Sequence, residues 1–389
     1  MNRKYAIFEQ GATLDYIKKS LKPYKIDKFY DSLSEDIISK NLKKNEAIIF
    51  KEISVALVGN VNVPSSFGIR EKFIGYEFIN EESFEVDERD MFSKPDDEPN
   101  NWGIQRVNVL NSNLTGDGVN VAILDTGYDK FHKQFANRKI ITKSFISKTA
   151  QDFNGHGMHC IGIACGYKDS DGIRYGIAYK SNIYACKVLD DSRKKRGYKA
   201  DIIRGILWAV KHKCKVINIS YGIRNNGKEY DKVFERVIKY AKNKGSITVA
   251  AVGNHSIRTN SLCGMECYSI ASPSDSPSAI AVSGINEEYD VYSLANQANL
   301  YLKQKIDFVA PATNIYSSWS TKSKIKTGSN MIFSGTSMAA AFVSGILALL
   351  FEKKPKAKCD EILKILKQNV LSCTDWELQD VGSGLVQIT

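Results

Sequence analysis

Ser337 stands at a position where a serine could act as a nucleophile. It follows Gly335 in a tight turn and precedes a run of helix-forming residues, so its hydroxyl lies at a predicted helix N-terminus. One apolar face of this helix is expected to be buried, through Val343, Ile346, Leu347 and Leu350. Free backbone N–H groups and the helix dipole favour negative charge there, which suits a serine whose reaction generates an oxyanion. A serine in such a turn can equally be an ordinary N-cap of a core helix, so the interpretation depends on finding partner residues.

Two other turns supply an acid and a base. Asp125 ends the apolar, β-branched run 119–125 and precedes a glycine turn, as expected where a buried parallel strand meets its loop. His156 has a glycine on each side and continues into a predicted helix. Open α/β sheets place their chemistry at the carboxyl ends of the strands. An Asp, a His and a Ser in this chain order match one of the known orders of a catalytic triad.

The blocks Asp125-Thr-Gly, Gly155-His-Gly-Met-His and Gly335-Thr-Ser-Met-Ala resemble the three signature blocks of subtilisin-like serine proteases. The resemblance extends from about residue 101 to the C-terminus. It implies that Ser337 attacks a peptide carbonyl, His156 transfers the proton and Asp125 orients the imidazole. The remaining histidines are expected to be structural; they are His132, His159, His212 and His255.

The resemblance also assigns residues around the triad. Asn254 follows the predicted strand 246–252 and is similar to the asparagine whose side-chain amide stabilises the oxyanion, with the Ser337 N–H as second donor. An extended substrate would pair with an edge by β-augmentation. The residues that resemble this edge are Ser220, Tyr221 and Gly222.

Two segments depart from the family pattern near the expected substrate site. The basic run 193–196 lies in a loop that would rim the non-prime subsites, and it can be read as a solvated loop, a selector for acidic substrate residues or a self-cleavage site. The insertion 256–268 is expected to reshape the wall of the primary specificity pocket. The preferred cleavage residues therefore cannot be carried over from the family.

The sequence predicts no required cofactor, and structural calcium is doubtful. Gln134 stands where many relatives have a ligating aspartate, whereas the segment 168–172 could offer oxygens to calcium or form a plain polar turn. Several of the eight cysteines lie in apolar stretches, where a reduced thiol acts as a small hydrophobe. Cys263 and Cys267 could form a metal or disulfide pair, but no second pair at zinc spacing accompanies them, so free thiols are expected. With no recognisable secretory signal and no window of about 18 apolar residues, these features predict a cytoplasmic protein that does not enter a membrane.

Strand and helix patterns alternate along the catalytic part of the chain. Strands are predicted at 181–189, 215–220 and 246–252, and helices at 199–213 and 230–244. This alternation requires a parallel sheet covered by helices on both faces. The expected fold class is therefore α/β, with a three-layer, mostly parallel, subtilisin-like sheet.

Residues 1–95 precede the resemblance and are interpreted as a small α+β domain, in which the apolar run 47–58 has the composition of a strand. The linker 96–101 joins it to a catalytic domain of residues 102–389. Residues 1–100 carry 15 Lys+Arg and 19 Asp+Glu, so the rest of the chain carries 39 and 24. Such complementary charge suggests docking of the two parts, or an acidic substrate. In this family a domain at this position is often a propeptide that blocks the active site; a permanent regulatory domain is the alternative.

These observations predict a serine endopeptidase that acts on polypeptides, either in general intracellular proteolysis or in maturation of a precursor, for which an acidic precursor peptide is a suitable partner. The N-terminal domain would be its intramolecular inhibitor. A catalytically silent protein that keeps the fold for binding is the rival hypothesis, against which the complete set of catalytic residues argues. The basic excess alone does not predict nucleic-acid binding, because no binding motif accompanies it.

Overall fold

The computed structural model describes residues 4–34, 41–59, 76–80, 83–84, 101–223, 229–256, 269–372 and 376–389. Its main feature is a nine-stranded sheet with the strand order β17-β18-β14-β13-β12-β11-β7-β9-β8. Neighbouring strands are parallel except for the pair β17–β18. The strands are β7 (Asn120–Asp125), β8 (Ile140–Ser144), β9 (Asn182–Lys187), β11 (Val216–Ile219), β12 (Ile247–Ala251), β13 (Ile280–Ile285), β14 (Phe308–Pro311), β17 (Val370–Leu371) and β18 (Leu385–Val386).

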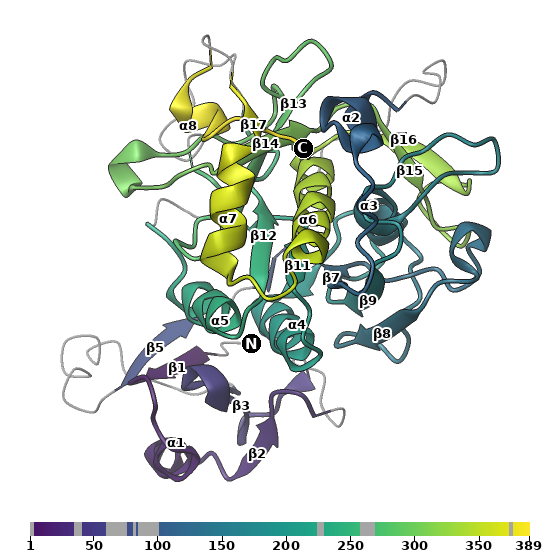
Figure 1. Cartoon of the computed structure of the whole chain (residues 1–389). Helices are drawn as coiled ribbons and strands as arrows, with labels where there is room; N and C mark the ends of the chain where they lie inside the picture. Colours follow the sequence, from purple (N-terminus) through teal and green to yellow (C-terminus); the bar gives the residue numbers. More distant parts are fainter. Residues whose placement is uncertain are drawn as a thin grey trace.

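Helices cover both faces of this sheet, which confirms the predicted three-layer α/β architecture (Figure 1). One face packs against α3 (His156–Cys165) and α6 (Thr336–Lys353), and α7 (Cys359–Gln368) lies against α6. The other face packs against α4 (Lys199–Lys211) and α5 (Lys232–Asn243). The central strands are buried on both faces, which explains why they read as continuous apolar runs rather than as an alternating pattern.

The remaining elements of the catalytic part are short. A hairpin of β15 (Ile315–Ser318) and β16 (Asn330–Phe333) packs next to α3, while α2 (Trp102–Arg106) and α8 (Leu378–Val381) lie near the ends of β14 and β13.

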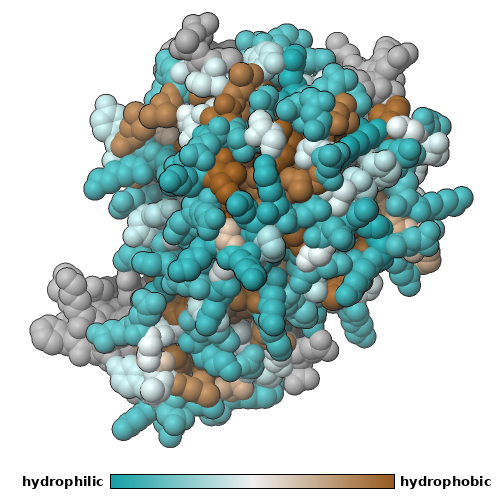
Figure 2. Space-filling model, viewed as in Figure 1, coloured by the Kyte–Doolittle hydropathy of each residue, from teal (hydrophilic) through white to brown (hydrophobic). Residues whose placement is uncertain are grey.

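Helix α6 is buried on all sides, whereas the sequence pattern predicted burial of one apolar face. Every residue from Thr336 to Phe351 is buried, because the helix lies between the sheet, α3 and α7. By length and composition α6 could cross a membrane, but 89% of its apolar window is enclosed by the protein. Figure 2 shows a mostly hydrophilic surface over this side of the molecule, with apolar residues in scattered patches.

The N-terminal residues form a second, five-stranded sheet with the order β2-β3-β4-β1-β5. Its strands are β1 (Lys4–Phe8), β2 (Lys28–Asp31), β3 (Glu46–Phe50), β4 (Val55–Val58) and β5 (Tyr76–Asn80). One face packs against α1 (Leu14–Leu21) and the other joins the core around α4 and α5. The apolar run 47–58 is therefore two antiparallel strands, divided by a short 3₁₀ turn and by Ser54, which has a φ of 53°.

Two arginines fasten the N-terminal sheet to the catalytic part. Arg204 of α4 donates to the carbonyl oxygens of Ser32 and Ser34, and Arg236 of α5 donates to those of Phe8 and Ile53. These contacts involve backbone carbonyls rather than carboxylates, so they differ from the simple charge complementarity that the composition suggested. The domain boundary near residue 95 and most of the linker lie outside the described residues.

Candidate active site

The three residues of the predicted triad lie at the carboxyl edge of the large sheet. Asp125 is the last residue of β7, His156 is the first residue of α3, and Ser337 is the second residue of α6. All three are 1% exposed. Parallel strands bring their carboxyl ends to one edge, and the helix that follows a strand starts there. The fold thus assembles residues that are far apart in the sequence.

Asp125 and His156 form a tight buried pair. The Nδ1 atom of His156 lies 2.8 Å from Oδ1 and 3.0 Å from Oδ2 of Asp125. Asp125 Oδ1 also accepts from the backbone N–H of Thr126 at 2.7 Å. This geometry places the proton of the neutral imidazole on Nδ1 and leaves Nε2 as the basic nitrogen.

Ser337 is held against the end of β11. Its hydroxyl donates to the carbonyl oxygen of Ser220 at 2.6 Å, and the Ser220 hydroxyl donates back to the Ser337 carbonyl at 3.0 Å. The Cys160 thiol interacts with Ser220 and lies 3.9 Å from His156 Nδ1, so it packs between the two sides of the site. Burial raises the pKa of this thiol, which therefore stays protonated.

Asn254 follows β12 and points its side chain at the start of α6. Its Oδ1 accepts from the backbone N–H of Thr336 at 2.9 Å and from the Thr336 hydroxyl at 3.0 Å. With the carbonyl oxygen committed to these donors, the side-chain NH₂ group is the part that can face a substrate. A donor fixed in this way beside a helix N-terminus is suited to a developing oxyanion.

The glycines around His156 are required by close packing. A Cβ atom on Gly155 would lie 2.1 Å from the Trp319 ring, and one on Gly157 would lie 2.6 Å from the carbonyl oxygen of Gly127. Gly155 also has a φ of 116°, which disfavours any other residue. The backbone thus approaches neighbouring groups closely on both sides of the histidine.

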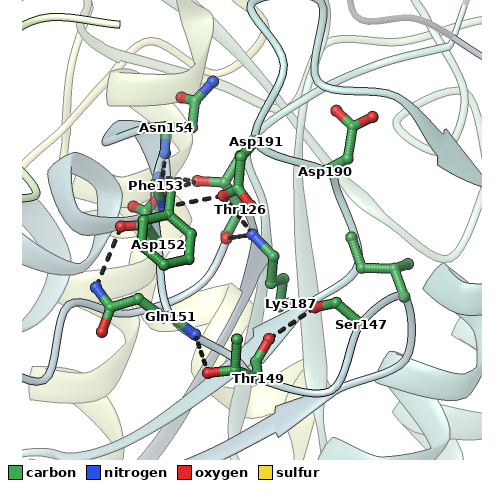
Figure 3. A network of polar contacts seen from close by, with 12 residues as sticks. Thr126, Ser147, Thr149, Gln151, Asp152, Phe153, Asn154, Lys187, Asp190 and Asp191 are labelled. Carbon is green, nitrogen blue, oxygen red and sulfur yellow. Dashed lines mark hydrogen bonds and ion pairs between the residues drawn. The ribbon is translucent and has the colours of Figure 1, made fainter. Parts of the chain in front are cut away.

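Sequence reasoning missed Asp152, a fully buried carboxylate that organises the turn before His156 (Figure 3). It accepts from the backbone N–H groups of Asn154 and Gly155, each at 2.8 Å, and from the Thr126 hydroxyl at 3.0 Å. Burial raises the pKa of Asp152, which these bonds and Lys187 oppose. The signal that could have found it is an Asp ahead of a predicted helix start.

The predicted substrate edge has its side chains turned inward. Ser220 is fully buried and Tyr221 is 2% exposed, so only the backbone of Ser220, Tyr221 and Gly222 can meet a substrate strand. A second edge was not predicted: β10 (Gly197–Tyr198) pairs antiparallel with β6 (Ser83–Phe84) of the N-terminal part. The loop of residues 190–196, called the rim loop below, leads directly into β10.

Three of the other histidines contact backbone carbonyl oxygens, and one of them, His159, lies on α3 three residues after His156. Ring nitrogens of His132, His159 and His212 contact the backbone carbonyl oxygens of Ser329, Ile315 and Trp208. Burial lowers the pKa of His159 to about 3, so it is neutral.

Within the described residues, one group of His, Cys, Asp and Glu side chains is close enough to hold a metal ion, and it consists of Asp125, His156 and Cys160. Since metal ligation needs a thiolate and the Cys160 thiol is protonated, this group fits the triad better than a metal centre. At the candidate calcium turn, Asp169 already accepts from the N–H groups of Asp171 and Ile173 and from the Tyr316 hydroxyl.

Comparisons with known proteins agree with this geometry. The sequence profile of the Subtilase family matches residues 116–384. The chain is 30% identical to serine protease AprX of Bacillus subtilis over 70% of this chain and 66% of that protein. It is 31% identical to thermitase of Thermoactinomyces vulgaris over 60% of this chain and 75% of that protein. With subtilisin BL of Lederbergia lenta the identity is 32% over 73% of this chain and 96% of that protein.

Solved structures show the same fold. A cold-adapted subtilisin-like serine proteinase matches 75% of this chain and 98% of its own, with a TM-score of 0.60 and 23% identity. Fervidolysin from Fervidobacterium pennivorans, a keratinolytic enzyme related to subtilisin, matches 100% of this chain and 60% of its own, with a TM-score of 0.70 and 20% identity. The chain therefore belongs to the subtilase family and is a subtilisin-like serine endopeptidase.

Proposed function

We propose that this chain hydrolyses peptide bonds through an acyl-enzyme, with Ser337 as nucleophile, His156 as general base and acid, and Asp125 as the residue that orients the imidazole. The observation that carries the proposal is the buried Asp125–His156 pair beside a helix N-terminus that presents Ser337. The Ser337 hydroxyl turns from the Ser220 carbonyl toward His156 Nε2 as a substrate carbonyl arrives. Hydrogen bonds of this kind often form only in the substrate complex.

In the first step, Ser337 Oγ bonds to the carbonyl carbon and its proton passes to His156 Nε2. The oxyanion accepts from the side-chain NH₂ of Asn254 and from the Ser337 N–H, which the α6 N-terminus reinforces. The tetrahedral intermediate collapses when His156 protonates the leaving amine. Water, deprotonated by the same histidine, then releases the acid and restores the serine.

The N-terminal domain is proposed to be an intramolecular inhibitor of this site. Strand β6 already pairs with β10, the edge that leads from the rim loop, so an extended segment of the chain occupies a strand-pairing position. The covered face of α4 holds Lys199, Asp201 and Arg204, charged groups that water could solvate if the domain left. Interfaces that separate are more polar than permanent ones, which favours a removable domain over a fixed one.

One experiment tests both proposals. The full chain and its Ser337→Ala variant are incubated side by side, followed by intact mass and labelled with a fluorophosphonate. Loss of an N-terminal fragment from the wild type alone, together with labelling that needs Ser337, is expected. If both chains stay whole but the wild type still labels, the site is active and the domain is permanent or is removed by another enzyme. A wild type that neither cleaves nor labels contradicts the serine mechanism.

We also propose that the enzyme matures a precursor with an acidic segment, in a reducing cytoplasm and without a required metal. The basic run Arg193–Arg196 in the rim loop, next to β10, supports the acidic substrate. The described cysteines are free thiols, which supports a reducing cytoplasm. The carboxylate oxygens of Asp169 already accept hydrogen bonds from the protein, which supports an enzyme that needs no calcium at this turn.

Substituting serine for all four residues of the basic run should reduce the preference for acidic over neutral peptides. The matched control removes the same charge at the far end of α6, by substituting serine for Lys353, Lys354, Lys356 and Lys358. An unchanged acidic-to-neutral ratio in the rim-loop variant rules out the acidic selector. An equal drop in both variants would indicate long-range charge rather than a local contact.

A further inference from the structure

A buried lysine, paired with a partly exposed aspartate, lies beside the catalytic turns and has no role in the steps above. Lys187 ends β9, is 1% exposed, and donates through Nζ to Asp191 Oδ1 at 2.6 Å and to the Thr126 carbonyl oxygen (Figure 3). In the parallel ladder, Lys187 is the direct partner of Asp125. The ammonium group therefore supports the turn that follows the catalytic aspartate.

The same pair also reaches the turn that carries the catalytic histidine. Asp191 Oδ1 accepts from the backbone N–H of Phe153 at 2.9 Å. The next residue in the rim loop, Ser192, accepts through its carbonyl oxygen from Asn154 Nδ2 at 2.9 Å. Asn154 Oδ1 in turn accepts from the His156 N–H at 3.1 Å. The rim loop is thus bonded at two consecutive residues to the segment that starts α3.

The other arm of the rim loop is the strand-pairing edge. The Asp190 N–H donates to the Arg196 carbonyl and the Asp190 carboxylate accepts from the Arg196 N–H, each at 2.9 Å. Leu189 and Gly197 form a bridge at the base of the loop, and Gly197 then pairs with β6. The rim loop is therefore closed at its base. One of its arms leads into β10, where an extended chain would pair, and the other arm is hydrogen-bonded to the turn that precedes His156.

We propose that Lys187 and Asp191 are positioning residues that couple the pairing of an extended chain along β10 to the placement of His156. This inference rests on the proposed triad. The Lys187 side chain is 2% exposed and that of Asp191 is 27% exposed. The pair tolerates little displacement, because separating it leaves the buried ammonium group of Lys187 desolvated and unpaired. Holding reacting groups to within about 1 Å is worth about 10²-fold in rate.

The primary test compares two peptides in the full chain, after any self-processing has reached completion by intact mass. Both peptides contain the same scissile bond. One peptide begins at the residue whose carbonyl is attacked, and the other has three further residues on the N-terminal side of it, so that it can pair with β10. In the wild type the extension should raise kcat. In Asp191→Asn and Lys187→Met the extension should still lower KM but no longer raise kcat, with a loss of about 10²-fold in kcat for the long peptide.

A pH profile separates positioning from general damage to the fold. Asp191→Asn leaves the positive charge of Lys187 near the imidazolium, so the acid limb of kcat/KM should move to lower pH. Lys187→Met leaves the negative charge of Asp191, so the limb should move to higher pH, and the double variant should restore it. The other titratable groups around the site are present in all three variants; they are Asp125, Asp152, Cys160, His159 and Tyr221. Of these, Asp152 loses the Lys187 charge that opposes the rise in its pKa in Lys187→Met and in the double variant.

The chain offers a matched control at the opposite edge of the sheet. Lys305 Nζ lies 2.6 Å from Asp307 Oδ1, and Asp307 Oδ2 accepts from the Ala281 N–H at 2.9 Å, just as Asp191 accepts a backbone N–H. Lys305→Met and Asp307→Asn should leave the kcat gain on extension and the acid limb unchanged. Thermal unfolding and fluorophosphonate labelling of every variant show whether the folded site is present.

The proposal is overturned if Asp191→Asn keeps the kcat gain on extension, or if both single variants lose activity equally on the two peptides without opposite pH shifts. If a single variant fails to fold, the kcat gain on extension is measured in the double variant instead, because that variant buries no unpaired charge. If the wild type is labelled by the fluorophosphonate and cleaves peptides, and the variants behave as the wild type does, this inference alone fails. A wild type that does neither defeats the proposed triad as well.

Discussion

The two helical layers of the large sheet are made of different kinds of helix. On one face, α3 and α6 are buried along almost their whole length by small and apolar residues, and each carries a residue of the triad in its first turn. On the other face, α4 buries charged residues under the N-terminal sheet, and α5 buries only one side. The catalytic layer is therefore fixed by the protein core, whereas the second layer depends on a neighbouring domain.

This difference has a physical consequence. Interiors are packed to nearly crystalline density, so α3 and α6 cannot shift without opening cavities. The contacts of α4 and α5 with the N-terminal sheet combine apolar packing with arginine-to-carbonyl hydrogen bonds, which water can replace. We therefore expect changes in the first layer to abolish chemistry without releasing the domain, and changes in the second layer to release the domain without altering the triad.

The largest effect is expected for Ser337→Ala. Activity on a peptide substrate should fall by about 10⁶-fold, because the residues of a triad act as a unit. Amide hydrogen exchange in β1 and β4 of this uncleaved variant should stay slow, since the Ser337 hydroxyl bonds to the Ser220 carbonyl and not to the N-terminal sheet. Residual self-cleavage in a purified Ser337→Ala chain would contradict the assignment.

A smaller loss is expected for Asn254→Ala. Removing one oxyanion donor costs about 10²- to 10³-fold in kcat with little change in KM. Thr336 also loses the acceptor for its N–H and hydroxyl, so a modest fall in thermal stability should accompany the kinetic effect. Steady-state kinetics and thermal unfolding measure the two separately. A rise in KM alone would indicate that Asn254 binds substrate rather than the oxyanion.

The catalytic layer should also be sensitive to acid through His159. Burial lowers the pKa of His159 to about 3, whereas an unfolded histidine has a pKa near 6.5, so the unfolded state binds more protons between these values. The free energy of unfolding should therefore fall as the pH drops below about 6.5, by an amount on the order of a few kcal/mol. Urea unfolding of Ser337→Ala at several pH values measures this slope, and His159→Gln should flatten it.

Arg236→Ala should weaken the attachment of the N-terminal sheet to α5, because it removes the donors to the carbonyl oxygens of Phe8 and Ile53. A charge-assisted hydrogen bond contributes about 1.5–3 kcal/mol. In a Ser337→Ala background, amides of β1 should exchange at least about tenfold faster, with no change in α3 or α6. Lys239→Ala, on the exposed side of the same helix, is the matched control. Equal protection in both variants would show that apolar packing alone holds the domain.

Local patterns predicted much of the fold. The strand at β9 and the helix at α4 coincide with their predicted ranges to within a few residues, because each follows from apolar periodicity and turn residues. The pattern failed where tertiary packing overrode it. For α6 it predicted one buried face, although the helix is surrounded, and for the run 47–58 it did not reveal the turn that divides β3 from β4.

The sequence by itself determined the residue types of the site, since Asp125, His156, Ser337 and Asn254 each stand in a short, glycine-marked segment whose conformation is local. Only the tertiary structure decided what supports them. Asp152, Lys187 and Asp191 act through contacts that join segments following different strands, and the pairing of β6 with β10 joins residues more than a hundred positions apart. Such contacts leave no periodic signal in a single chain, because their geometry exists only once the parallel sheet has brought its strand ends to one edge.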